Sequence, residues 1–266
     1  GDYFLKKGLI NEDLCNDLRM GALLHDIGHG PFSHLIEEVM TEKSNITHED
    51  IARKVIRNTD IKDILNRQGH DPNKIADLAV GLSQDRSKFV NDLMTGGLSV
   101  DVMDYLLRDS HFTGVEYGKV DVHRVINSFE VFENSLALNQ AAQYAFEALL
   151  LSRFEMFRAV YFHRTVRAAE IMLIRAISLA DDLLNLTDIS DLDRYLSLTD
   201  EVTLEKLSNI DTAGNSSFIK AKKLAMDYKS RKLLKCVFEK PVHKKDQFLD
   251  RIFKQKKFRT SIAHEI

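Results

Sequence analysis

Apolar residues recur every three or four positions along most of the chain, a spacing typical of amphipathic helices. Residues that cap helices precede several of these runs. The expected helix starts are Asn11 or Asp13 for a helix toward Leu24, Thr47, Asp71-Pro72, and Ser99 for a helix through Asp109. The pattern therefore predicts a mainly α protein.

The longest helical run spans residues 140–183 and is apolar on nearly every side, which predicts a helix buried at the centre of the molecule. Two short segments, 135–139 and 234–242, are alternating or β-prone and predict a minor β element. Residues 184–216 are rich in Asp, Ser and Thr and should connect the helical body to the C-terminal part.

Composition narrows the class of protein. With 266 residues, 44% of them apolar, the chain can bury a sizeable core. Cys15 and Cys236 are too far apart to form a metal-type CxxC pair, and two lone thiols indicate a reducing compartment, so we expect a cytoplasmic protein. No apolar run approaches the ~20 residues that a bilayer span requires, so we expect no membrane partner.

Charge is distributed unevenly, although the net charge is only −3. Residues 220–259 hold 15 Lys and Arg against 4 Asp and Glu, a local charge of +11, which leaves −14 for the rest. A basic block favours an anionic partner, with a solvated basic face as the alternative. We expect a catalytic domain over residues 1–183 and a basic α/β appendage over residues 184–266, with a regulatory or oligomerising role.

Three imidazoles and one carboxylate lie within ten residues in the segment 24–34, which reads LHDIGHGPFSH. His25 and Asp26 are adjacent, and at a helix end both can reach one ion. Their nitrogen and oxygen donors suit Zn²⁺, Mn²⁺, Fe²⁺ or Ni²⁺ better than Ca²⁺. A His-Asp pair alone is a weak signal, but the whole string has no evident packing purpose and favours a functional site.

The glycines of this string predict its backbone. Gly28 and Gly30 should permit a tight turn, and Pro31 suits the first position of the next helix. Such a turn would bring His29 and His34 back beside the ion.

Each of two later segments places polar side chains on one face of its own predicted helix. The first face carries a carboxylate, a phenol and a guanidinium, and the second carries two cations and two rings, which are costly to bury unless they meet an anionic, flat ligand. The residues are Asp101, Tyr105 and Arg108, bordered by Asp109, and then Arg153, Phe157, Tyr161 and Arg164. Surface ion pairs and buried Arg–acid pairs are the competing interpretations.

The string HDIGHGPFSH and the two later segments together resemble the HD-domain phosphohydrolases, and more narrowly the deoxynucleoside triphosphate triphosphohydrolases (dGTPase-like and SAM-and-HD-domain-like enzymes). The similarity runs from about residue 12 to residue 240. It implies a helical HD-domain fold and a metal site. The metal ligands it implies are His25, Asp26 and Asp101.

The same resemblance implies roles for other residues. His29 would lie beside the reacting phosphate, and His48-Glu49 would be a further catalytic pair. His34 would be the general acid or the imidazole on the nucleophile side, with Glu37 holding its proton. It also implies substrate and effector contacts. These are Tyr105 and Tyr161 at the sugar or base, Asp109 at the deoxyribose hydroxyl, Arg153 at phosphate with Arg164 on the same stripe, and Arg231 and Lys235 at an activating nucleotide.

The chain departs from the family pattern in several places. The resemblance implies a first metal-binding histidine some tens of residues before His25, but residues 1–24 contain none, so we expect it in a segment before Gly1. Ser99, Val102 and Phe157 replace an Asp, a phosphate-binding Lys and a His of some relatives, which puts phosphate binding and substrate range in question.

The function predicted from these features is metal-dependent hydrolysis of deoxynucleoside triphosphates to deoxynucleoside and triphosphate, with a divalent transition metal or Mg²⁺ as cofactor. Two alternatives stay open. One is an HD-type nucleotidase or phosphodiesterase with another substrate, and the other is a non-catalytic regulator that binds nucleotide or nucleic acid through residues 220–259. Because the basic stretch and the acidic remainder are complementary, and because members of the resembled family form dimers and tetramers, we expect a homo-oligomer that binds a nucleotide substrate and a nucleotide effector.

Overall fold

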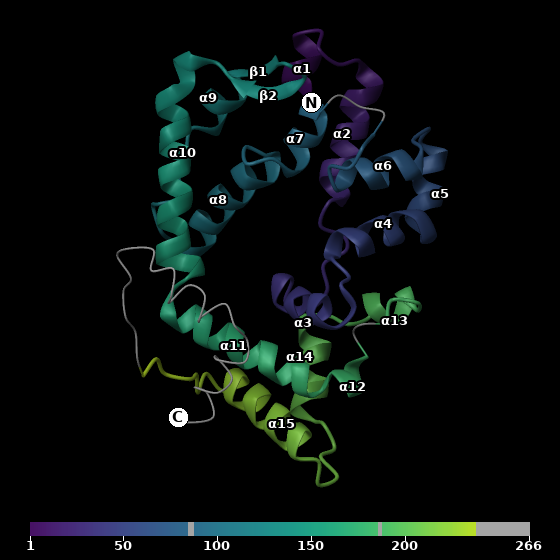
Figure 1. Ribbon diagram of the computed structural model, residues 1–266, viewed down its shortest axis with the longest axis vertical. Coiled ribbons are helices and arrows are strands. Elements are labelled where there is room, and N and C mark those ends of the chain that lie inside the picture. Colours follow the sequence, from purple (N-terminus) through teal and green to yellow (C-terminus); the bar gives the residue numbers. More distant parts are fainter. Residues whose placement is uncertain (85–87, 186–187, 238–266) are drawn as a thin grey trace, which may run out of the picture. The chain divides into compact units, whose positions relative to one another are not determined.

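A computed structural model of the 266-residue chain describes residues 1–84, 88–185 and 188–237 (Figure 1). The chain divides into two compact units, Gly1–Leu234 and Lys235–Ile266. In the described residues no helix combines the length and apolarity that crossing a bilayer requires.

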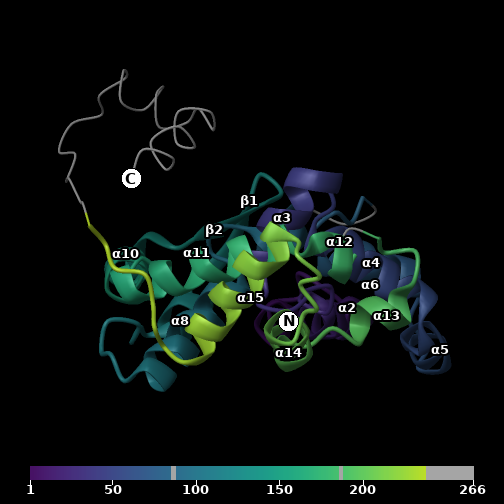
Figure 2. The same ribbon diagram turned by 90° about the horizontal axis from the view of Figure 1, so that it is seen from below.

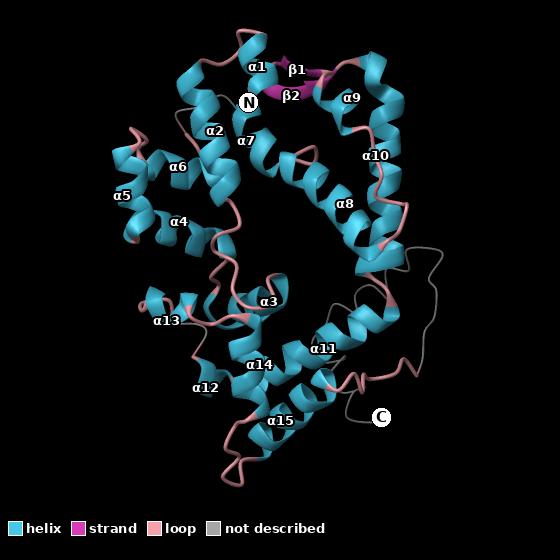
Figure 3. Ribbon diagram, turned by 180° about the vertical axis from the view of Figure 1, so that it is seen from behind, coloured by secondary structure: helices cyan, strands magenta, loops and turns pink. Residues whose placement is uncertain are grey.

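Helices account for most of the first unit, as Figure 3 shows in cyan, and the mainly α prediction is confirmed. Four predicted caps are present: Asn11, Thr47 with its capping box, Asp71 before Pro72, and Ser99. The helices of the first half are α1 (Asp2–Lys6), α2 (Glu12–Leu24), α3 (His34–Ser44), α4 (His48–Asn58), α5 (Asp60–Arg67), α6 (Pro72–Ala79), α7 (Lys88–Thr95), α8 (Val100–Thr113) and α9 (Val122–Ile126).

A two-stranded antiparallel hairpin follows α9 and is the minor β element of the described chain. Strand β1 (Phe129–Phe132) pairs with β2 (Ser135–Leu138), so that Phe129 faces Leu138. The strand predicted at 135–139 is confirmed, whereas β1 was not predicted. The other predicted strand, 234–242, carries no strand in its described part, Leu234–Val237, and its remainder lies outside the described residues.

The long run after the hairpin is not one buried helix, and that expectation is wrong. It divides into a 3₁₀ turn (Gln140–Ala142), α10 (Gln143–Met156), a π-helical turn (Phe157–Tyr161), α11 (Arg164–Leu179) and α12 (Asp181–Leu184). Helix α10 exposes Tyr144, Leu151 and Phe154. Apolar residues on all sides therefore do not imply a central position, because a helix can also keep part of its apolar surface exposed.

The polar segment after α12 is also helical in part. It contains α13 (Leu192–Leu196) and α14 (Asp200–Ser208), and α15 (Ser216–Lys229) follows. Helix α15 runs beside α11 in both views (Figures 1 and 2), and α11 in turn packs on α3. Residues up to Leu234 thus belong to the same compact unit as the N-terminal helices. A functional division between residues 183 and 184 stays a prediction.

Two hydrophobic clusters flank the histidine-rich segment 25–34 of the chain. One includes Leu18 of α2 and Met103 of α8, and the other includes Ile36 of α3 and Ile177 of α11. Residues 25–33 connect α2 to α3 and therefore pass from the first cluster to the second. This connection carries His25, Asp26 and His29.

Candidate active site

His25, Asp26 and Asp101 converge although 75 residues separate the two carboxylates. His25 caps the C-terminus of α2, Asp26 follows in the turn, and Asp101 lies in the first turn of α8. His25 Nε2 lies 3.2 Å from Asp26 Oδ1 and 3.5 Å from Asp101 Oδ1. One potential ligand atom of each residue lies within 4.8 Å of the other two, so the group is small enough to surround one cation.

The donors of this group fit a divalent cation. His25 Nδ1 donates a hydrogen bond to the Ala22 carbonyl at 2.8 Å, which fixes the tautomer and turns Nε2 toward the two carboxylates. That Nε2 is buried, and the described residues give it no hydrogen-bond partner. Its contact with the Asp101 carboxylate raises the pKa of His25 to about 9 and lowers that of Asp101, so the two carboxylates favour positive charge at this position.

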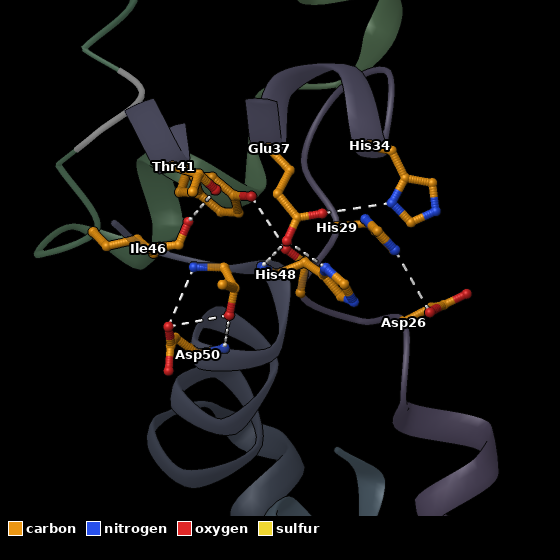
Figure 4. A network of polar contacts seen from close by, with 11 residues as sticks. Asp26, His29, His34, Glu37, Thr41, Ile46, His48 and Asp50 are labelled. Atoms are coloured by element: carbon orange, nitrogen blue, oxygen red, sulfur yellow. Dashed lines mark hydrogen bonds and ion pairs between the residues drawn. The ribbon is translucent and has the colours of Figure 1, made fainter. Parts of the chain in front are cut away.

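A second group consists of His29, His34 and His48, from the turn and from the first residues of α3 and α4 (Figure 4). The rings of His29 and His48 are stacked, with centroids 4.1 Å apart and planes at 12°. Because imidazole donors and lone pairs lie in the ring plane, two stacked rings direct their nitrogens in parallel rather than toward one point. This arrangement suits contacts to neighbouring oxygens of an anion better than three ligands on one ion.

Glu37 of α3 holds two of these histidines (Figure 4). Its Oε1 accepts from His48 Nδ1 at 2.8 Å and from the His48 backbone N–H at 3.2 Å, while Oε2 lies 3.5 Å from His34 Nδ1. Burial acts to raise the pKa of the Glu37 carboxyl, but the hydrogen bonds from His48 outweigh it and hold this pKa below its ordinary value. The predicted Glu37–His34 pairing is therefore present, and the contact with His48 is the shorter one.

His29 is the most enclosed member of the group. Burial, followed by the nearby His48, lowers the pKa of His29 to about 4, so its ring is neutral near pH 7. Its Nε2 lies 3.6 Å from Asp26 Oδ1. Asp26 therefore borders both groups of side chains.

A third group lies on α8 and on the segment 153–161. Tyr161 donates a hydrogen bond to Asp109 Oδ2 at 2.6 Å, and the rings of Tyr105 and Tyr161 meet edge to face at 6.2 Å. Burial, then the bond to Asp109, raises the pKa of Tyr161, so its hydroxyl stays protonated. The Arg153 guanidinium lies over the Phe157 ring at 5.8 Å.

All three groups line one cavity of about 710 Å³. From the predicted set, its walls include His25, Asp26, His29, His34, His48, Glu49, Asp101, Tyr105, Asp109, Arg153 and Tyr161. Glu170 of α11 also lines it and was not predicted, because a lone acid in a helix gives no sequence signal. A volume of this size is in the range of small-molecule sites.

The turn that presents the histidines differs in detail from its prediction. Neither Gly28 nor Gly30 has a positive φ; the left-handed residues are Phe32 and Ser33, with φ of 58° and 49°. Gly28 is required by close packing instead, since a Cβ there would lie 2.0 Å from the His48 carbonyl oxygen. Pro31 lies in the turn rather than at the first helical position, because α3 begins at His34.

Sequence comparison identifies the family of this chain. The model of the HD domain matches residues 8–109, and that of the HD associated region matches residues 120–266. The chain belongs to the HD-domain phosphohydrolase superfamily. The predicted resemblance to this superfamily is thereby confirmed, and HD domains bind divalent metals, as the first group of ligands would allow.

The relatives of this HD-domain protein include an uncharacterized protein and a protein that is named as an enzyme. It is 35% identical over 164 residues to the uncharacterized protein YwfO of Bacillus subtilis, covering 61% of this chain and 36% of that protein. It is 28% identical over 232 residues to the deoxynucleoside triphosphate triphosphohydrolase SAMHD1 homolog of Dictyostelium discoideum, covering 84% of this chain and 44% of that protein. The chain thus spans less than half the length of both relatives.

A solved structure shares the fold. The crystal structure of a phosphohydrolase from Bacteroides thetaiotaomicron superposes with a TM-score of 0.71 at 25% sequence identity, over 99% of this chain and 67% of the other. The described residues therefore share their fold with this phosphohydrolase, whereas the HD domain itself matches residues 8–109.

Four predicted site residues of this HD-domain protein are absent from the cavity wall, and one of them, Glu37, contacts His34 and His48, which do line it. Arg164 begins α11 after the break at residues 162–163, so it does not continue the stripe of Arg153 and Tyr161. Arg231 follows α15 and is exposed, whereas Lys235 is the first residue of the second unit. Most of the basic stretch 220–259 lies outside the described residues, so the roles of these residues stay predictions.

Proposed function

We propose that this chain carries the active site of a metal-dependent phosphohydrolase that converts deoxynucleoside triphosphates to deoxynucleoside and triphosphate. One observation carries the proposal: a potential metal group, a histidine group held by Glu37, and a group of two tyrosines with Asp109 and Arg153 all line the same cavity. These are the parts needed to bind a cation, a phosphate chain and a sugar.

His25, Asp26 and Asp101 would hold the divalent cation, which we expect to be Zn²⁺, Mn²⁺, Fe²⁺, Ni²⁺ or Mg²⁺. When bound, such a cation polarises a phosphate oxygen and lowers the pKa of water. The family resemblance implies one further ligand, a histidine, which residues 1–24 do not include.

The histidine group would act on the phosphate at which the bond breaks. Neutral His29, stacked on His48, would donate its single ring N–H to a phosphoryl oxygen. His34 is the more exposed ring and would deliver a proton to the leaving group, while Glu37 orients it from the Nδ1 side. Glu49 also lines the cavity and would be the second member of a catalytic pair with His48.

The third group would recognise the nucleoside end. Tyr105 and Tyr161 offer ring faces and edges for stacking, and Arg153 offers a guanidinium to a phosphate. Asp109 keeps one carboxylate oxygen on the Tyr161 hydroxyl and has acceptor capacity left for a sugar hydroxyl. Arg164 does not line the cavity, and its contact with substrate is a further part of this proposal.

Regulation and assembly form a separate part of the proposal. Arg231 and Lys235 would bind the phosphates of an effector nucleotide, and the protein would act as a homo-oligomer in the cytoplasm. A nucleic-acid partner for residues 220–259 is the weaker alternative.

A substrate panel tests the activity. The full-length protein, loaded with Mn²⁺, would be given deoxynucleoside and ribonucleoside triphosphates, monophosphates and a phosphodiester, with chromatographic detection of nucleoside and triphosphate. We expect turnover of deoxynucleoside triphosphates with intact triphosphate as product. Release of phosphate or pyrophosphate from these substrates, or nucleotide binding without turnover of any substrate, would contradict the proposal.

A second candidate, a nucleotidase or phosphodiesterase, is favoured by the charge of the cavity. Among the described residues that line it, Arg153 is the single Lys or Arg, while five are carboxylates: Asp26, Glu49, Asp101, Asp109 and Glu170. A monophosphate or a diester carries less negative charge than a triphosphate and needs fewer cations. Preferential turnover of those substrates in the same panel would select this candidate.

A further inference from the structure

The connection between α2 and α3 has a backbone that its own sequence does not stabilise. Phe32 and Ser33 both adopt positive φ, a region that residues with a Cβ rarely occupy. Two such residues in succession persist only where surrounding contacts hold them. Contacts from other parts of the chain must therefore hold Phe32 and Ser33 in this conformation.

Tyr195 of α13 makes the first of these contacts. It is among the largest fully buried side chains of the described chain, and its hydroxyl donates to the Gly28 carbonyl at 3.1 Å. A Cβ on Gly30 would lie 2.6 Å from the same hydroxyl oxygen, so Gly30 is the residue that admits it. The tyrosine thus fixes the backbone on both sides of His29.

Asp200 makes the second contact from the first residue of α14. Its Oδ1 accepts a hydrogen bond from the backbone N–H of Phe32 at 2.8 Å, across 168 residues of sequence. Phe32 is the first of the two left-handed residues, and its ring also meets the edge of Tyr228 of α15 at 6.5 Å. Because α3 begins at His34, the backbone conformation of residues 32–33 determines the direction in which the His34 side chain leaves the backbone.

We propose that Tyr195 and Asp200 are positioning residues that hold residues 28–33 in the shape that places His29 and His34 in the cavity. The inference rests on the proposed function in so far as those histidines act on substrate. Neither Tyr195 nor Asp200 lines the cavity, so both act through the backbone of the connection. The HD associated region, which contributes both residues, thereby takes part in building the active site of the HD domain.

A merely structural role would have a different signature. Both residues could stabilise the fold alone, in which case their removal would lower the melting temperature and leave the imidazoles in place. Positioning instead predicts that the environments of His29 and His34 change, and that kcat falls while KM for the nucleotide changes little, since the sugar-binding group lies on other helices.

The variants can separate the hydrogen bonds from other effects. Tyr195→Phe keeps the ring and loses the bond to Gly28. Asp200→Ala loses the bond to Phe32, whereas Asp200→Asn keeps an oxygen acceptor at the same position and should restore it. Glu201→Ala is the matched control, because Glu201 is the next acid in the first turn of α14 and is exposed.

The test measures three quantities on the full-length protein. NMR would follow the His29 and His34 imidazole signals and the hydrogen exchange of the Phe32 amide, and kinetics would give kcat and KM. In Asp200→Ala we expect the Phe32 amide to exchange at least about tenfold faster, since its acceptor is lost. In both Asp200→Ala and Tyr195→Phe we expect shifted imidazole signals and kcat lower by about tenfold, with KM within about threefold. Asp200→Asn and Glu201→Ala should resemble the wild type.

The possible failures are distinct. Unshifted imidazole signals in both Tyr195→Phe and Asp200→Ala, with only a lower melting temperature, would overturn the positioning role and leave the proposed function intact. Shifted signals in a protein whose wild type hydrolyses no phosphorylated substrate would uphold the positioning of the histidines and overturn the proposed function.

Discussion

The cavity holds two groups of side chains whose histidines the fold has placed in opposite electrostatic states. His25 faces two carboxylates at 3.2 and 3.5 Å, and its pKa is raised to about 9. His29 lies against another imidazole, and burial lowers its pKa to about 4. The same side chain is therefore cationic at one end of the site and neutral at the other, according to its neighbours.

The two groups suit opposite charges. The first has two carboxylates and one imidazole, which suits a cation. In the second, Glu37 accepts a hydrogen bond from His48 Nδ1, and the three imidazoles line the cavity. Under the proposed function, a phosphate bound to a metal cation would contact both groups.

The change expected to break this arrangement most is Asp26→Ala, because Asp26 approaches both His25 and His29. It should lower turnover by about three orders of magnitude or more, since the cation supplies a large part of the charge stabilisation. Hydrolysis assays with measurement of bound metal would check this. Asp104→Ala, which removes an exposed acid paired with Arg108 on α8, should leave both quantities unchanged. Full activity of Asp26→Ala would contradict the metal site.

Glu37→Gln should break the histidine group alone. The amide cannot hold two imidazoles as a carboxylate does, so we expect kcat to fall by about a hundredfold, within the usual contribution of general acid–base catalysis. Mn²⁺ affinity should change by less than about threefold, because Glu37 does not touch the first group. The control is Glu38→Gln, an exposed neighbour on the same helix. An equal loss of metal affinity would show that the two groups do not act separately.

The pH dependence of metal uptake should sharpen the contrast. Because His25 must lose its proton to bind a cation, protons compete with the metal below the pKa of about 9 in the metal-free protein. Between about pH 6 and pH 8, the apparent Mn²⁺ affinity should rise by up to about tenfold per pH unit. Titrations of metal-free protein at three pH values measure this slope. A flat profile would show that His25 is not a ligand or is not protonated.

Much of this site follows from the sequence because its residues lie in local motifs. Six of them come from the strings at 25–34 and 48–49, and helix caps such as Ser99 place Asp101 in the first turn of α8. The caps were predictable because each depends on a side chain bonding a backbone N–H two or three residues away. The convergence of Asp101 on His25 came from family resemblance, since spacing alone does not relate residues 75 apart.

Contacts over long sequence distances were not predictable in this way. Tyr195 and Asp200 reach the turn from more than 160 residues away, and nothing in their local sequence marks them. The glycines were recognised, but as residues of a tight turn, whereas the close approach of His48 and Tyr195 requires them. The break of the long run at 157–163 was missed as well, because apolar periodicity does not distinguish a π-helical turn from a continuing α-helix.

Tyr161→Phe should have the smallest effect and should leave both imidazole groups unchanged. It removes the hydroxyl that donates to Asp109 at 2.6 Å, and a single hydrogen bond to a carboxylate contributes about 1.5–3 kcal/mol at most. Since Asp109 then turns more freely, we expect KM for deoxynucleotides to rise by about threefold to tenfold and the preference over ribonucleotides to weaken. Tyr144→Phe, at an exposed tyrosine of α10, is the matched control. Parallel kinetics on deoxy and ribo substrates, with Mn²⁺ titration, would decide the matter. A lower kcat with an unchanged preference for deoxynucleotides would indicate that Tyr161 acts at the reacting phosphate and not in sugar recognition.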